Sequence, residues 1–410
     1  MGLPDHRMRI IFLNRYFFPD HSATSQMLSE LAFYLAASGH SVTVITSRQR
    51  YDDAAARLPA FEHIRGVDVH RVRTTRFGRA HLPGRAGDYA SFYLAAGWRL
   101  WHLARRHDVI IAKTDPPLIS VVAWLMARWR GATLVNWLQD VFPEVAERLR
   151  LPLLAGPQAG LLRRLRNHAL HAANMNVVLG ERMAAVAAGA GVPAARISII
   201  PNWADKDLIY PVPDSANPLR RAWSLESQCS VCYSGNMGRA HEFETILDAA
   251  RLLAERSAAI GFLFIGGGAQ HRWLEAAVEQ RGLPNVQFQP YQDSANLHLS
   301  LSAGTIHLVS LRPELEGYVF PSKLYGILAA GRPVAFIGDV EGEIARLVHR
   351  EGVGVVVAQG DAAALAEALE RLAGDASLRH AMGERARALL CHQYDKAVAL
   401  RRWRALLEAL

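Results

Sequence analysis

The sequence has few cysteines and no long apolar run. Cysteine accounts for 3 of the 410 residues, too few for a disulfide framework, so we expect a reducing compartment. Cys229 and Cys232 form a C-x-x-C, but the apolar, strand-like run around them predicts core cysteines, not a redox or metal pair. No stretch reaches about 18 uninterrupted apolar residues, which argues against a membrane-spanning helix. The apolar run at 10–13 is too short for a secretory leader, so none is expected.

Acidic residues are scarce in the first half of the chain. Residues 1–200 carry 25 Lys and Arg against 14 Asp and Glu, whereas residues 201–410 carry 21 against 24. This imbalance predicts that the first half meets something anionic, either a membrane surface or nucleic acid. An ordinary solvated basic face would give the same count. Nucleic acid ranks lower, because no aromatic and basic module of a known type is visible.

Two nucleotide-binding motifs are missing as well. No G-K-[ST] occurs, so there is no P-loop. The segment "GNMGRA" at 235–240 spaces its glycines by three, unlike the dinucleotide fingerprint G-x-G-x-x-G, and no acidic residue obviously ends the following strand. We therefore do not expect a nicotinamide-dependent oxidoreductase that binds NAD.

What the sequence does contain is a regular alternation of strand and helix patterns. In the first half this alternation predicts a doubly wound α/β domain with parallel strands. The predicted strands are Met8–Leu13, Ser41–Thr46, Val67–Arg73, Val109–Ala112, Thr133–Trp137 and Met175–Leu179, and the helices include Gln26–Ser38 and Leu118–Trp129.

The second half shows the same alternation after a short strand and a segment rich in Pro, Asp and Asn around 197–213, which is typical of a linker. The predicted strands are Cys229–Tyr233, Gly261–Ile265, Val286–Phe288, Thr305–Ser310, Pro333–Ile337 and Val353–Val357. The predicted helices are Glu242–Ala254, Gln270–Gln280, Ala295–Ser302, Ser322–Ala330, Glu343–His349 and Ala362–Leu372. We predict two facing Rossmann-like domains with a cleft between them, at 1–203 and 204–385, and a final helix at 386–410 that packs back on the first domain.

Glycines and basic residues gather where strands of the second half end. Each of three successive elements offers backbone amides or cationic side chains to an anion, and the chemistry predicts a ligand with two phosphates. Lys323 opens a predicted helix, where a lysine opposes the helix dipole at a cost of about 0.3–1 kcal/mol unless an anion sits there. A lysine that points into water is the alternative. The residues are Gly235, Gly238, Arg239 and His241, then Gly266 to Gly268, and then Lys323 after Pro321 and the expected helix cap Ser322.

At this point the sequence resembles a known family. The segments "SGNMGRAHEFETIL", "FPSKLYGILAAGRPV" and "IPNWAD" are similar to family 4 glycosyltransferases of the GT-B fold, in the bacterial branch that builds O-antigen, capsule and colanic-acid-type polysaccharides. The start "FFPDHSATSQMLSELAFYLAASGHSVTVIT" resembles the acceptor-side start of that family. The resemblance implies a retaining enzyme that needs no bound metal and no cofactor. It also implies a nucleotide-sugar donor, expected to be a UDP-sugar, and a polyprenyl-diphosphate-linked glycan as acceptor.

The resemblance also implies roles for individual residues. Arg239 and Lys323 would offset charge on the leaving diphosphate, and Asp140 would orient the acceptor or act as a base. A helix-capping role for Asp140 is the alternative. The implied donor-binding residues are Gly235, Asn236, Gly238, Arg239, His241, Gly266, Gly267, Glu316, Tyr318, Pro321, Ser322, Lys323 and Leu324, and the acceptor-binding residues are Ser22, Ala23, Thr24 and Asp140.

The chain departs from the family pattern at two places. Many members carry two glutamates separated by seven residues near the donor sugar and ribose, and the corresponding positions here are Tyr318 and Gly326. Glu316 is a candidate substitute for the first glutamate. The usual Arg and Lys of the first loop of the second domain correspond to Asn236 and His241, with Arg239 as a candidate replacement.

Two helical segments of the first half mix apolar, aromatic and basic residues. They are "YASFYLAAGWRLWHLARR" and "GLLRRLRNHALHAA", and such helices can lie on an anionic bilayer. We therefore expect a cytoplasmic enzyme, peripheral on the inner face of the membrane; a core face with a solvated basic side is the alternative. Two other functions remain open: a sugar-nucleotide epimerase of the same fold, and a catalytically silent nucleotide-sugar-binding subunit.

Overall fold

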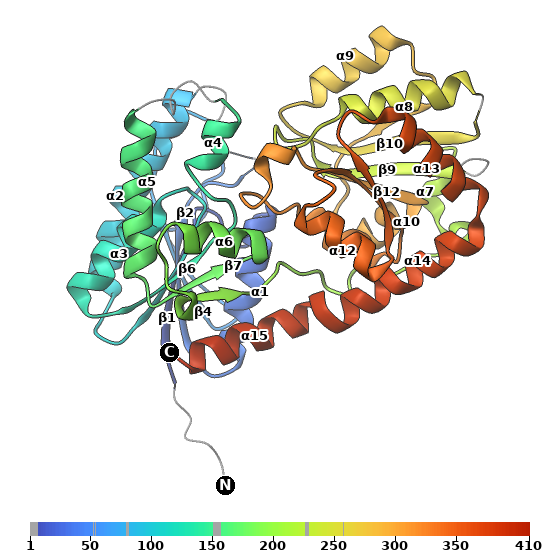
Figure 1. The fold of residues 1–410 in the computed structure, drawn as a ribbon. Helices are drawn as coiled ribbons and strands as arrows, with labels where there is room; N and C mark the ends of the chain where they lie inside the picture. Colours follow the sequence, from blue (N-terminus) through green and yellow to red (C-terminus); the bar gives the residue numbers. More distant parts are fainter. Residues whose placement is uncertain are drawn as a thin grey trace. The chain divides into compact units, whose positions relative to one another are not determined.

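The chain forms two compact units, each with its own sheet, mostly parallel in the first unit and wholly parallel in the second (Figure 1). The computed structural model describes residues 7–51, 53, 55–78, 82–150, 157–225, 229–256 and 258–410. The first unit comprises Met1–Pro201 with Gly317–Phe320 and Leu400–Leu410, and the second comprises Asn202–Glu316 with Pro321–Ala399.

The first unit is built on an eight-stranded sheet in the order β3-β4-β2-β1-β5-β6-β7-β8. Neighbouring strands are parallel except for β3 and β4, which are antiparallel. Because the other strands run the same way, the loops that follow β1, β2, β4 and β5 leave one edge of the sheet. The strands are β1 (Arg9–Leu13), β2 (Ser41–Ser47), β3 (Phe61–Ile64), β4 (Val67–Val72), β5 (Val109–Lys113), β6 (Thr133–Trp137), β7 (Met175–Val178) and β8 (Ile197–Ile199).

Helices cover both faces of this sheet. In Figure 1, α2, α3 and α5 lie on one side of the strands and α1 on the other. The central strands are apolar and buried, as sheets covered on both faces require. The helices are α1 (Ala23–Ala37), α2 (Leu82–Leu103), α3 (Ile119–Arg130), α4 (Glu144–Arg148), α5 (Pro157–Ala172) and α6 (Glu181–Gly189).

The second unit has a six-stranded, wholly parallel sheet in the order β11-β10-β9-β12-β13-β14. Its strands are β9 (Cys229–Asn236), β10 (Ile260–Gly267), β11 (Val286–Gln289), β12 (Ile306–Ser310), β13 (Val334–Gly338) and β14 (Gly354–Ala358). Its helices are α7 (Pro218–Ala222), α8 (Glu244–Glu255), α9 (His271–Arg281), α10 (Leu297–Ala303), α11 (Lys323–Ala329), α12 (Glu343–Glu351), α13 (Ala362–Gly374), α14 (Ala376–Leu389) and the start of α15 (Lys396–Glu408).

Local chemistry accounts for several of these boundaries. The Asp361 carboxylate accepts a hydrogen bond from the Ala364 amide at 3.0 Å and so caps α13, and Asp375 caps α14 through the Leu378 amide at 2.9 Å. The helix α12 buries Ile344 and other apolar side chains on one face and leaves its charged residues outside.

The predicted fold class is confirmed, and the predicted strands recur as β1, β2, β4 to β7 and β9 to β14. Cys229 and Cys232 are free thiols on β9, and Cys232 is buried in the core, where burial raises the pKa of its thiol. Ser322 is the N-cap residue of α11, as expected. Its backbone is already helical, at φ −64° and ψ −19°, and its side chain makes no capping hydrogen bond, so it does not stabilise the helix start in the expected way.

Candidate functional site

Glycines let the ends of β9 and β10 approach each other closely. Gly235, Gly266 and Gly268 have φ of +119°, +123° and +143°. A Cβ at Gly266 would lie 2.4 Å from the Gly235 carbonyl oxygen, and one at Gly268 would lie 2.4 Å from Asn236 Oδ1. A side chain has no room at Gly266 or Gly268, and the positive φ of Gly235 disfavours one there, so glycine at these positions lets the two strand ends lie this close.

Lys323 reaches these glycines from α11. A Cβ added to Gly235 would lie 4.0 Å from Lys323 Cε. The Lys323 ammonium donates a hydrogen bond to the Tyr233 hydroxyl, and Nζ lies 3.6 Å from the centroid of the Tyr233 ring. The Tyr233 hydroxyl in turn donates to the Asn236 carbonyl oxygen at 3.0 Å. The aromatic face and these two hydrogen bonds hold the ammonium over the β9 turn.

The neighbouring His241 is held in one tautomer. Its Nδ1 lies 2.6 Å from the Ser310 carbonyl oxygen, which can only accept, so Nδ1 carries the proton. The other nitrogen, Nε2, lies 3.5 Å from Lys323 Nζ and presents a lone pair to the ammonium. Burial, together with the positive charge of Lys323, lowers the pKa of His241 to about 3. His241 is therefore a neutral imidazole that accepts a hydrogen bond from Lys323.

The Lys323 ammonium has no anionic partner among the residues that the structure describes. Burial lowers the pKa of Lys323 well below its ordinary value. Tyr233 and His241 accept hydrogen bonds from two of its three N–H groups, which leaves the third N–H for a further acceptor. A desolvated cation beside exposed backbone turns is the environment in which an anion binds most strongly.

Of the other donor-site candidates, Arg239 is free to bind a ligand, whereas Gly267 and Leu324 already make contacts within the protein. Arg239 is exposed and makes no hydrogen bond or ion pair with a described residue, so its guanidinium is available. Gly267 accepts a hydrogen bond from the Tyr291 hydroxyl through its carbonyl at 3.2 Å. Leu324 has a fully buried side chain, and its amide donates to the Pro321 carbonyl at 3.3 Å, which argues against a donor contact.

The positions of the two family glutamates have structural explanations. A Cβ at Gly326 would lie 3.3 Å from Leu301 Cδ1, so any side chain there would require the Leu301 side chain to shift. Tyr318 belongs to the first unit, where Arg148 donates to its hydroxyl at 3.2 Å and stacks 4.7 Å from its ring centroid. Glu316 accepts from the Glu343 amide at 2.7 Å at the start of α12. Donor roles for Tyr318 and Glu316 stay predictions.

The predicted acceptor loop lies at the carboxyl edge of the first sheet. The Ser22 hydroxyl donates to Asp20 Oδ1 at 2.6 Å, and Ala23 begins α1. The Thr24 hydroxyl donates to Asp115 Oδ2 at 2.9 Å. The loop is held by Lys113, 0% exposed, whose ammonium donates to the Thr24 carbonyl at 2.9 Å. Burial lowers the pKa of Lys113 well below its ordinary value.

Asp140 follows β6 in the same unit. Its side chain keeps contact with solvent, yet the surrounding protein displaces much of the water around the carboxyl group. This burial, with the like charge of Asp115, raises the pKa of Asp140 to about 6. The helix-capping alternative is wrong, because Pro143 is the N-cap of α4 and no side chain caps it.

Sequence reasoning missed Tyr233, Lys113 and Asp115. The available signals were weak: Tyr233 is one apolar residue of a strand, and Lys113 and Asp115 stand together in "AKTDPP" where β5 ends. A charged pair at the carboxyl end of a buried strand is a sign of a polar site at the edge of a parallel sheet.

Comparison with known proteins identifies the family. A family described as "Glycosyl transferase 4-like domain" matches residues 23–203, and one described as "Glycosyl transferases group 1" matches residues 219–389. This chain is a GT-B glycosyltransferase of the family 4 type. The resemblance seen in the motifs of both halves is thereby confirmed.

Individual relatives and solved structures agree with this family assignment. The chain is 27% identical to the putative colanic acid biosynthesis glycosyl transferase WcaI of Escherichia coli K12 over 85% of this chain and 88% of that protein. It is also 27% identical to the probable glycosyltransferase WbjE of Pseudomonas aeruginosa, over 76% of this chain and 77% of that protein. Its fold matches sucrose-phosphate synthase of Thermosynechococcus elongatus with a TM-score of 0.78 at 20% identity, covering 98% of this chain and all of that one.

Proposed function

We propose that this glycosyltransferase moves a sugar from a UDP-sugar to a lipid-linked, polyprenyl-diphosphate glycan acceptor during surface polysaccharide assembly. The reaction proceeds with retention of anomeric configuration and without a metal or other cofactor. The observation that carries the proposal is the Lys323 ammonium, desolvated and without an anionic partner among the described residues, above the glycine turn of β9. The relative WcaI, whose name places it in colanic acid biosynthesis, supports the polysaccharide context.

The donor proposal follows from the charge that Lys323 and Arg239 supply. As the bond between the sugar and the diphosphate breaks, negative charge grows on the leaving phosphate, and two cations at that place would stabilise it. The backbone of Gly235 can approach the phosphates because no Cβ intervenes. The HepE protein of Anabaena, with a TM-score of 0.72 at 17% identity over 98% of this chain and all of that one, was solved with UDP-glucose, which supports UDP as the nucleotide.

A thermal-shift panel tests this proposal first. UDP should stabilise the protein, and at a hundred times its dissociation constant the free energy of unfolding should rise by about 2.7 kcal/mol. The panel compares UDP, GDP, ADP, CDP-sugars and NAD, and turnover of the responding donor is then measured with and without EDTA. A response to NAD alone, or loss of turnover in EDTA, would contradict the proposal.

The peripheral membrane location has its own support in the first unit. The helices α2 and α3 expose tryptophans on their outer side: Trp98 is 69% exposed and Trp129 is 64% exposed. The Arg130 guanidinium stacks 4.1 Å from the centroid of Trp101, which packs edge-on against Trp129. Aromatic and cationic side chains mixed on one face suit the interface of an anionic bilayer. No helix in the described parts of the chain is long and apolar enough to cross a membrane.

Replacing Trp98 and Trp129 together by serine should weaken binding to anionic vesicles by at least fivefold, because both rings lose their place in the lipid interface. Cosedimentation with phosphatidylglycerol vesicles measures the change. Trp273→Ser is the matched control, since Trp273 is 41% exposed on α9 of the second unit. Equal binding by the double variant and the control would remove this face as the membrane contact.

A further inference from the structure

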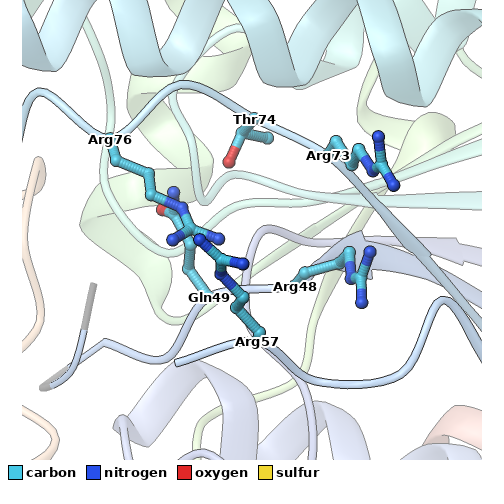
Figure 2. A pocket seen from close by; sticks show the side chains of 6 residues that line it. All are labelled: Arg48, Gln49, Arg57, Arg73, Thr74 and Arg76. Carbon is cyan, nitrogen blue, oxygen red and sulfur yellow. The ribbon is translucent and has the colours of Figure 1, made fainter. Parts of the chain in front are cut away.

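Four arginines surround one pocket in the first unit, a cluster that the sequence did not single out (Figure 2). The pocket has a volume of about 470 Å³. It lies on the loops that follow β2 and β4 and on the segment that leads into β3, and no carboxylate is among the lining residues that the structure describes. These residues are Arg48, Gln49, Arg57, Arg73, Thr74 and Arg76.

The positive charges in this pocket are not neutralised within the described parts of the chain. Arg57, Arg73 and Arg76 make no hydrogen bond or ion pair there, and Arg48 uses its Nε only to donate to the Leu58 carbonyl at 2.7 Å. Nearby Arg71, by contrast, is paired with the Glu62 carboxylate. Arginines that share a hollow without acids repel one another, and an anion relieves that repulsion.

Two polar side chains complete the lining of the pocket. The Thr74 hydroxyl oxygen is buried and has no hydrogen-bond partner among the described residues, so it is free to donate to a ligand. The Gln49 amide is fixed from both sides, because it donates to the Thr75 carbonyl at 2.8 Å and accepts from Arg15 at 3.2 Å. In the view of Figure 2, the guanidinium groups of Arg57 and Arg76 lie beside Gln49, and those of Arg48 and Arg73 lie on the other side of Thr74.

The chemistry of these groups selects a diphosphate. Guanidinium groups bind phosphate oxygens in a two-pronged manner, and a diphosphate presents several such oxygens and more than one negative charge. A single carboxylate, as in a uronic acid, would leave most of the four cations without a partner. The volume is also far larger than one small anion needs.

The place of the pocket connects it with the acceptor loop. β1, β2, β4 and β5 are parallel, so the loops with the arginines and those with Thr24 and Asp115 leave the same edge of the sheet. Gln49 and Arg15 join the two parts directly, since Arg15 sits in the loop that leads from β1 toward α1. We infer that this arginine pocket holds the diphosphate of the lipid-linked acceptor, an inference that rests on the proposed function.

Titration calorimetry with inorganic diphosphate tests the pocket itself. The protein is first saturated with UDP, so that the region around Lys323 is occupied. The variant Arg57→Ala/Arg73→Ala should bind diphosphate at least tenfold more weakly than the unmodified protein, and it should fold, because both side chains are exposed and without partners among the described residues. The variant Arg272→Ala/Arg371→Ala removes two exposed charges from the second unit and should bind normally.

Two further probes separate the sources of the diphosphate. Farnesyl diphosphate in detergent micelles should compete with inorganic diphosphate for the protein but not for the pocket variant. Phosphatidylglycerol vesicles should bind the pocket variant as well as they bind the unmodified protein. Loss of vesicle binding without loss of diphosphate binding would mean that the arginines meet lipid headgroups, and it would overturn the inference.

The failures of the two proposals can be told apart. If no UDP-sugar stabilises the protein but diphosphate binds in the arginine pocket, the anion site stands and the proposed transfer reaction fails. If UDP binds and is turned over while the pocket variant binds diphosphate as tightly as the unmodified protein, the reaction stands and the pocket inference is wrong. Four solvated arginines with no ligand would also give that second result.

Discussion

Lys323→Met should lower the turnover of the sugar nucleotide by at least tenfold while the fold survives. Methionine keeps the length and apolar stem of lysine beside the Tyr233 ring but has no ammonium to stabilise the leaving phosphate. A tenfold loss corresponds to about 1.4 kcal/mol of transition-state stabilisation. Initial rates at varied donor concentration measure the change, and a fall in kcat larger than any rise in KM would show that the charge acts in the transition state.

A control on His241 separates loss of charge from loss of structure. The positive charge of Lys323 is one cause of the low pKa of His241, so this pKa should rise in Lys323→Met. Titration of the ring by NMR reads it directly. The melting temperature of the unliganded variant should fall little, because the substitution removes the cost of burying an ammonium as well as the hydrogen bond that the ammonium makes. Normal turnover in both Lys323→Met and Arg239→Ala would end the argument that these cations hold the phosphates.

The sheets could be predicted from the sequence because their strands are marked locally. Val334–Gly338, for example, is an apolar run between a glycine turn and a helix start, and it forms β13 fully buried. The strand β3 was missed because "FEHI" alternates apolar and charged residues on an edge, and only its antiparallel pairing with β4 fixes it. The segment 317–320 was placed with the second domain, yet its contacts put it in the first unit.

The candidate site was predictable only where one short segment carries it. Lys323 stands out because a lysine directly after Pro321 and Ser322 breaks the pattern of a helix start. Its partner Tyr233 is 90 residues away, and the two meet only because β9 pairs with β12 in the sheet. The arginine pocket likewise joins the loops after β2 and β4, whose pairing no local pattern shows.

Asp140→Asn should reduce kcat by about a hundredfold or more if its carboxylate accepts the proton of the acceptor hydroxyl, the usual range for loss of a general base. Asparagine keeps the shape and can still orient the hydroxyl, but it cannot take up a proton. Single-turnover rates with saturating donor and acceptor measure the effect. A loss below threefold would assign Asp140 to binding alone.

The pH profile of Asp140 gives the more specific test. Its pKa is raised to about 6, so the active carboxylate is lost as the pH falls through that value, and kcat/KM should fall with it. Because a raised pKa means that the charged form is less favourable in the folded chain, Asp140→Asn should also melt no lower than the unmodified protein at pH 8.

Asp115 provides the matched variant for this profile. Its negative charge is one cause of the raised pKa of Asp140, so Asp115→Asn should move the acidic limb of kcat/KM to lower pH. The asparagine retains an oxygen that can accept from the Thr24 hydroxyl, which keeps the acceptor loop in place. An acidic limb that stays near pH 6 in Asp115→Asn and persists in Asp140→Asn would belong to another group, and Asp140 would lose its role as the base.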